Sequence, residues 1–220
     1  MVSVAVALPE GGRVSLLSTA DKEKISAAIT AAEKQTSGEF VAVIALASDD
    51  YFYIPTLWAA MLALVVPSVF VVAGLGLDNM ILTQFITFIV VTVIFRWQPL
   101  KMKLIPTDIK QRRARRYAHE QFFLQNLHHT DQRNGVMLFV SEAERYVEIM
   151  ADKGVNDIVD DGTWDQVISD FVSHIKAGQI AEGYLAAISK IENVLQQNFP
   201  NTDTDKNELP NHLIEVGLPD

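Results

Sequence analysis

The sequence predicts an α/β sandwich, in which one sheet carries helices on its faces, interrupted by a two-helix transmembrane hairpin. Three observations lead to this fold class. Two long uncharged stretches lie inside the 220-residue chain. Apolar residues recur at helical spacing on either side of them, and three short apolar runs separate the helical segments. Because no internal repeat is evident, we expect one polar domain with an apolar insert.

The first predicted helix begins after Ser18, which forms a capping box with Asp21. Apolar residues then fall on one helical face over residues 25–32, and Gly38 lies beyond the end of the helix. Residues 40–46 are continuously apolar and partly β-branched. This pattern predicts a strand that is covered on both faces and is therefore central in the sheet.

Residues 51–77 form the first uncharged stretch. These 27 residues contain no Asp, Glu, Lys, Arg or His, and about 20 helical residues cross a bilayer. We expect the span at Thr56–Leu75, with a kink at Pro67 that a lipid-embedded helix tolerates. The alternative is a pair of buried helices in a soluble core, but such helices usually carry polar positions at the helical period.

Residues 79–95 form the second uncharged stretch. Its 17 residues are at the lower limit for a span, and the charged end of Arg96 can reach the lipid headgroups. Trp58 and Trp97 would lie at the same membrane interface if the two segments run antiparallel. The two stretches therefore predict a transmembrane hairpin.

The distribution of basic residues predicts the orientation. Eight of the 18 Lys and Arg residues lie between residues 96 and 116, whereas the connection between the spans contains only Asp78. Because positive charge beside a span stays in the cytoplasm, we expect a plasma or inner membrane protein with its polar domain on the cytoplasmic side. The same bases are candidates for lipid-headgroup contact: Lys110, Arg112, Arg113 and Arg116. A topology signal without further role is the alternative.

The polar remainder continues with a basic helix over residues 107–127. Strands follow at residues 136–140 and 146–150, and the alternating polar face of the second predicts an edge strand. Thr163 and Gln166 form another capping box, and the helix that they open is followed by a last helix that ends before Pro200. The predicted divisions are an N-terminal tail (1–17), a split α/β domain (18–50 plus 107–200), the hairpin with its basic flank (51–106) and a disordered or loosely attached C-terminal tail (201–220).

The polar domain contains several short motifs. They are Ser37-Gly38-Glu39, the run from Asn134 to Ser141, the run from Glu144 to Ile149, Asp152-Lys153-Gly154, and Trp164 with Gly178 and Gly183. Together these motifs resemble the TPM-domain family. The chain is similar to a bacterial membrane-anchored branch of that family, related to thylakoid acid-phosphatase-like lumen proteins. The resemblance implies a Rossmann-like α/β/α sandwich with a mixed sheet and no dinucleotide fingerprint. This chain differs from most members of the family because its membrane segment lies inside the domain.

Acidic residues near predicted strand ends suggest a cation site. The candidates are Asp49, Asp50, Asp152 and Asp157. If their strands are neighbours and end at one edge of the sheet, the carboxylates would converge where open α/β sheets bind ligands. Oxygen ligands suit calcium or magnesium, and the resemblance implies a calcium site in some relatives. A solvated acidic loop is the alternative, because the spacing is not that of an EF-hand.

The composition excludes several functions. The chain has no cysteine, and its 27 acidic residues outnumber 18 Lys and Arg residues, for a net charge of −9. We therefore expect no disulfide scaffold, no thiolate site and no nucleic-acid partner. A mean hydropathy of +0.16 is high for a soluble protein and agrees with membrane segments.

Two hypotheses on function remain open. The first is a non-catalytic accessory or assembly factor for a membrane protein complex, a role that the resemblance implies for some relatives. Its partners would be the lipid bilayer and another membrane protein. The alternative is a divalent-metal-dependent phosphatase that acts on phosphate esters. The sequence has no cysteine nucleophile, no Gly-x-Ser-x-Gly turn and no phosphate-binding P-loop, so this second hypothesis depends on the acidic residues.

Overall fold

The computed structural model describes residues 2–7, 17–74, 80–130, 132–160, 162–201 and 213–217. The chain divides into two compact units. The first contains Met1–Ser48 and Gln111–Asp220, and the second is Asp49–Lys110. We call them the domain and the insert, and each is described by itself.

The domain is built on a mixed five-stranded sheet. Its strands are β1 (Val2–Ala7), β2 (Phe40–Ala45), β3 (Val136–Ser141), β4 (Tyr146–Ala151) and β5 (Ile214–Val216), in the order β1-β4-β3-β2-β5. β2 runs parallel to both β3 and β5, whereas β4 is antiparallel to β3 and to β1. The chain therefore enters β2 and β3 at one end of the sheet and enters β4 at the other.

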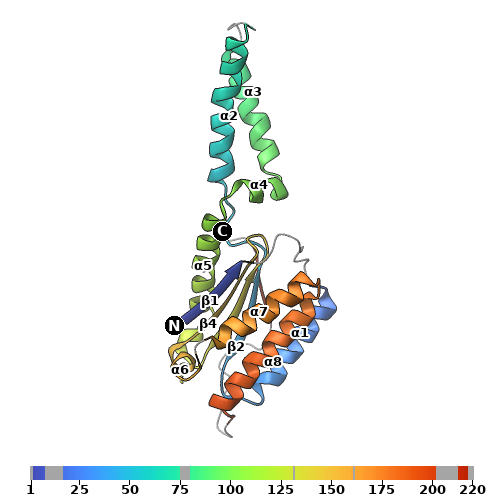
Figure 1. Ribbon diagram of the computed structural model, residues 1–220, viewed down its shortest axis with the longest axis vertical. Coiled ribbons are helices and arrows are strands. Elements are labelled where there is room, and N and C mark those ends of the chain that lie inside the picture. The colour runs from blue at the N-terminus through green and yellow to red at the C-terminus, as the bar shows by residue number, and fades with distance from the viewer. Residues whose placement is uncertain are drawn as a thin grey trace. The chain divides into compact units, whose positions relative to one another are not determined.

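Helices cover both faces of this sheet (Figure 1). One face carries α1 (Thr19–Glu33), α7 (Thr163–Lys176) and α8 (Ile180–Asn198), and the other carries α5 (Thr107–Leu124). In β2, Phe40 and Ala42 contribute to the core beneath the three helices, whereas Val41 and Val43 contribute to the core beneath α5. Burial on both faces explains why this strand is a continuous apolar run. The prediction of a mixed α/β fold is confirmed.

A local capping contact sets the start of the first helix of the domain. Ser18 is the N-cap of α1, and its hydroxyl oxygen accepts the backbone N–H of Asp21 at 3.2 Å. The predicted cap of α7 differs, because Gly162 occupies the N-cap with a φ of +87° and makes no side-chain capping bond. Thr163 instead donates its hydroxyl to the carbonyl of Asp160. The capping-box interpretation of Thr163 with Gln166 is therefore wrong.

Three parts of the sheet differ from the sequence expectations. The tail predicted at residues 1–17 includes β1, which pairs with β4 along its whole length. β4 is therefore not an edge strand, and Glu148 on its polar face is fully buried. Within the predicted tail 201–220, residues 214–216 form β5 beside β2. Residues 202–212 and 218–220 of that tail lie outside the described part of the chain.

The insert contains three helices. α2 (Tyr53–Val72) and α3 (Met80–Phe95) pack against each other, and α4 (Gln98–Leu104) follows. α2 has 20 residues, a mean hydropathy of 2.1 and little burial, so it is long and apolar enough to cross a membrane. α3 has 16 residues and falls short of that length. Among the described residues one helix meets the criterion, so a two-helix transmembrane hairpin is not confirmed.

Shorter elements complete the chain. The 3-10 helix η1 (Leu127–His129) follows α5, and α6 (Lys153–Asn156) follows β4. Both lie next to the loops that enter β3 and leave β4, and they frame the polar contacts described next.

Candidate functional site

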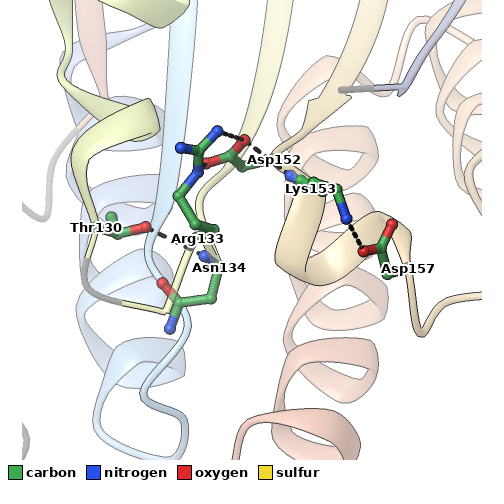
Figure 2. A network of polar contacts seen from close by, with 6 residues as sticks. All are labelled: Thr130, Arg133, Asn134, Asp152, Lys153 and Asp157. Atoms are coloured by element: carbon green, nitrogen blue, oxygen red, sulfur yellow. Dashed lines mark hydrogen bonds and ion pairs between the residues drawn. The ribbon is translucent and has the colours of Figure 1, made fainter.

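Polar side chains gather at the end of the sheet where β3 begins and β4 ends (Figure 2). Arg133 precedes β3, and its guanidinium donates to both carboxylate oxygens of Asp152, at 2.6 and 3.2 Å. Asp152 is 3% exposed and also accepts the backbone N–H of Lys153 at 2.8 Å, which caps α6. We call Arg133 and Asp152, with Thr130 and Asn134, the Arg–Asp cluster.

Asn134 joins this cluster to β2. Its backbone N–H donates to the hydroxyl oxygen of Thr130 at 3.1 Å, and its side-chain amide donates to the carbonyl of Ser37 at 2.6 Å. Thr130, Asn134 and Ser37 are all buried. The loops that enter β2 and β3 and leave β4 are therefore held together by buried hydrogen bonds, which are expensive to break.

Two glycines allow these loops to approach closely. A Cβ added at Gly154 would lie 2.4 Å from the carbonyl oxygen of Gln132 and 2.6 Å from that of Arg133. A Cβ at Gly135 would lie 2.6 Å from the carbonyl oxygen of Leu127. Because the opposing atoms are backbone atoms, neither position can accept a side chain without a shift of the loop. The Asn-Gly and Asp-Lys-Gly motifs are explained by this packing.

A second cluster lies at the opposite end of the sheet. The buried carboxylate of Glu144, in the turn between β3 and β4, accepts the backbone N–H of Ser48 with both oxygens at 3.1 Å and the hydroxyl of Ser141. The hydroxyl oxygens of Ser48 and Ser141 lie 2.8 Å apart. We call these three residues the Ser–Glu cluster. All three are at most 5% exposed, so the serines cannot reach a substrate and the cluster ties the segment after β2 to the turn.

Burial and a neighbouring negative charge raise the pKa of an acidic group beside this turn. Burial first, and then the carboxylate of Glu215, raise the pKa of Glu142 to about 7, while Lys22 opposes the shift. Lys22 donates to Glu215 at 2.7 Å and so holds β5 to α1. Glu142 therefore changes charge near neutral pH at the end of the sheet where β2 and β3 finish.

A third polar pair is buried on the α5 face of β4. The phenol of Tyr146 donates to Oε2 of Glu148 at 2.9 Å. Burial and the neighbouring carboxylate raise the pKa of this phenol well above its ordinary value. Because Tyr146 is 3% exposed and Glu148 is fully buried, the pair stabilises the interior and cannot exchange a proton with a bound substrate.

The sheet does not bring together the strand ends that the four predicted cation ligands follow. Asp49 and Asp50 follow the end of β2, whereas Asp152 and Asp157 follow the end of β4, and β4 runs opposite to β2 and β3. The strand ends that they follow are therefore about 17 Å apart, the rise of a six-residue strand. The condition that these strands end at one edge of the sheet is therefore not met, because the sequence pattern does not give the direction of β4.

Each of the four acids has a local contact instead. Asp49 accepts the backbone N–H of Tyr51 at 2.9 Å, Asp50 accepts that of Phe52 at 3.4 Å, and Asp157 pairs with Lys153. In the part of the chain that the structure describes, no three His, Asp or Glu side chains are grouped so that they could hold a metal ion. The described residues do not fit the calcium site that the family resemblance implies.

The predicted headgroup ligands lie along α5. Arg112 and Arg116 are exposed, Lys110 and Arg113 are half-buried, and Lys110 donates to the carbonyl of Met102 at 3.3 Å. The opposite face of α5, with Ala114, Tyr117, Ala118 and Phe122, is buried against the sheet. The basic run is therefore the outer face of a helix whose inner face belongs to the core.

Sequence reasoning missed the Ser–Glu cluster. Ser48 lies just before the apolar insert, and Glu144 was noted only as part of a family motif. The available signal was the place of Glu144 in the short segment between two predicted strands. In the structure this segment is a tight turn in which Arg145 has a φ of +53°. A carboxylate in such a turn is well placed to accept backbone N–H groups from a neighbouring segment.

The fold and its polar contacts define an α/β sandwich whose buried clusters fix the loops at both ends of the sheet. The TPM domain family matches residues 103–194, which include β3, β4, Glu144 and Asp152. The resemblance seen in the sequence is confirmed by this match, and over these residues the chain is similar to the TPM domain.

A solved structure is also similar to this chain. It is the NMR structure of BA42 protein from the psychrophilic bacterium Bizionia argentinensis sp. nov., with a TM-score of 0.58 and 21% sequence identity. The similarity covers 92% of this chain and 97% of BA42. At this identity it shows a common fold and nothing of function. None of the curated proteins matches the chain.

The Arg–Asp cluster predicts unequal effects of one substitution at two nearby positions. Asp152→Asn should lower the free energy of unfolding by about 1–3 kcal/mol, because it removes the charge of a buried acceptor that binds Arg133 and the backbone N–H of Lys153. Asp157→Asn is the matched control and should cost about 0.5 kcal/mol or less, since its pair with Lys153 is exposed. Urea unfolding of the full chain in detergent measures both values. Equal losses would contradict a structural role for the cluster.

Glu142 predicts a pH dependence of stability. Its pKa is about 7 in the folded domain and near 4.5 in an unfolded chain, so the folded state binds the proton more tightly. Its contribution is therefore full below about pH 4.5 and is lost as the pH rises to about 7. Glu142→Gln should raise the melting temperature at about pH 8 relative to the wild type and flatten the profile. The exposed Glu182→Gln is the control, and parallel profiles for wild type and Glu142→Gln would refute the prediction.

Proposed function

We propose that the protein is a membrane-anchored TPM-domain protein that acts as a non-catalytic accessory or assembly factor for a membrane protein complex. The observation that carries this proposal is the exposed apolar surface of the insert. Large hydrophobic side chains are exposed along both α2 and α3. They include Leu57, Leu64, Val69, Val72, Ile81, Phe85, Ile89 and Val93.

The dimensions of the insert suit a bilayer. α2 has 20 residues and is about 30 Å long, which matches the hydrocarbon core of a bilayer. Pro67 lies inside α2 without ending the helix, as a lipid-embedded helix allows. α3 packs beside α2 and, in its described residues, contains no charged side chain. We infer that both helices lie in lipid, with α3 as a short second span that ends at Arg96.

The polar side chains of the domain favour a non-catalytic role. The carboxylates at the centres of the two polar clusters, Glu144 and Asp152, are buried and already accept hydrogen bonds from the protein. A phosphatase needs an accessible nucleophile or metal-bound water together with positive groups for the phosphoryl oxygens. The guanidinium of Arg133 is a positive group of this kind, but it is already paired with the carboxylate of Asp152.

Anchoring would make a weak contact effective. A domain confined beside a membrane has a high effective concentration towards a membrane protein partner, so a small interface suffices. The basic residues on the outer face of α5 would favour the cytoplasmic side and contact anionic headgroups, with Arg112 and Arg116 exposed and Lys110 and Arg113 half-buried. We place the domain in the cytoplasm, beside a plasma or inner membrane.

Anchoring predicts the effect of charges on the insert. Leu64→Arg and Ile89→Arg change residues that are about 60% exposed, so neither should disturb the packing of the insert in water. In a bilayer each Arg costs roughly 3 kcal/mol, and the double variant should leave the membrane fraction on an alkaline carbonate wash. Ile158→Arg, at an exposed position of the domain, is the control and should remain with wild type in the membrane. Release of the wild-type chain by the same wash would contradict anchoring.

The non-catalytic role predicts no turnover of phosphate esters. The full chain in detergent should not hydrolyse p-nitrophenyl phosphate above the rate of a blank, with or without Ca²⁺ or Mg²⁺. Hydrolysis that needs the cation and is abolished by Asp50→Asn, but not by Asp108→Asn, would overturn the accessory role in favour of a metal-dependent phosphatase. Asp108 is exposed in the first turn of α5 and serves as the matched control.

A further inference from the structure

The end of the insert that contains the start of α2 and the end of α3 carries a compact group of aromatic and basic residues. They are Phe52, Tyr53, Arg96, Trp97, Lys101 and Lys103, and we call them the collar. Phe52, Tyr53 and Trp97 are 59%, 49% and 68% exposed. The proposed function places the apolar helices in lipid but assigns no class of lipid to this group.

The chain changes direction within the collar. α3 ends at Phe95, and Trp97 has an extended conformation with φ −66° and ψ 117°. Pro99 then lies in the first turn of α4, where a proline is tolerated. Figure 1 shows α4 across the base of α2 and α3, and not as a continuation of α3. If α2 and α3 follow the membrane normal, α4 therefore lies along the membrane surface.

Contacts within the insert hold α4 in this position. Tyr51, Ile54 and Ile105 form a buried apolar cluster, and Met102 of α4 packs against it. The ammonium group of Lys101 donates to the backbone carbonyl of Asp50 at 2.9 Å. α4 is thus fixed to the segment that begins α2, and the orientation of the collar follows from packing.

The collar presents positive charge beside aromatic rings. The guanidinium carbon of Arg96 lies 5.9 Å from the centre of the Phe52 ring, within the range of a cation–π contact. Arg96 and Lys103 are exposed. Residues 96–110 contain the bases Arg96, Lys101, Lys103 and Lys110 but only one acid, Asp108. Exposed bases beside aromatic rings suit a surface at which negative charges border an apolar layer.

We propose that the collar lies in the headgroup layer of the membrane and binds the phosphates of anionic phospholipids, with Arg96 and Lys103 as the headgroup ligands. Trp and Tyr rings prefer this layer because they are amphipathic, and a base near an anionic membrane surface strengthens binding roughly fivefold. Lys101 positions α4 through its bond to Asp50. The proposal rests on the proposed function, because it requires the insert to be in lipid.

The test measures which lipids lie next to Trp97. The full chain carrying Trp58→Phe is reconstituted in bilayers that contain acyl-brominated phosphatidylglycerol or, at the same fraction, acyl-brominated phosphatidylcholine. Bromine quenches nearby Trp fluorescence, and Trp164 is 4% exposed in the core of the domain, so it supplies a constant background. We expect stronger quenching by the anionic lipid at low salt and a smaller difference at high salt, because salt screens exposed charges.

Variants connect the lipid preference with the collar. Arg96→Gln with Lys103→Gln should lower the preference for the anionic lipid by roughly fivefold or more, and Trp97→Phe should remove the quenched signal. Lys24→Gln in α1 with Lys34→Gln at the C-cap of α1, both exposed, changes the charge equally and should leave the preference unchanged. Equal quenching by both lipids would overturn the headgroup proposal while the anchor stands. Failure of the chain to enter bilayers would instead overturn the proposed function.

Discussion

The antiparallel pairing of β4 with β3 is the constraint on which the arrangement of polar groups depends. Because β4 reverses direction, the loop that leaves it meets the loops that enter β2 and β3. Arg133, Asn134 and Asp152 can therefore bond across three loops at that end. At the other end of the sheet, the parallel pairing of β2 with β3 places the turn after β3 beside the segment after β2, where Glu144 holds Ser48. The two polar clusters therefore follow from the relative directions of β2, β3 and β4.

The family motifs acquire a physical explanation from this topology. The glycines in Asn-Gly and Asp-Lys-Gly are required because Gly135 and Gly154 face backbone carbonyls of neighbouring loops. The acid of the Ala-Glu-Arg turn is a buried acceptor, and the arginine that follows adopts a left-handed conformation. These residues secure the ends of the sheet, so the presence of the motifs does not by itself indicate catalysis.

Much of the fold could be predicted from local patterns. The cap at Ser18 and the apolar run of β2 are properties of a few adjacent residues. β1 and β5 were missed because each is an edge strand whose partner lies far away in the sequence. Alternation along β4 alone cannot reveal that β1 pairs with β4 or that Glu148 is fully buried. The expectation that the strands followed by the acidic residues end at one edge of the sheet was wrong because periodicity predicts strands but not their relative directions.

The position of the insert has a consequence for synthesis. β2 leaves the ribosome before α2 and α3, and its partner β3 leaves after them. The central parallel pair of the sheet can therefore form only after the whole insert has been made, so folding of the domain is delayed until the hydrophobic segments are complete. A nascent chain paused within the insert exposes β2 as an unpaired apolar strand, which makes it a client for chaperones at the ribosome.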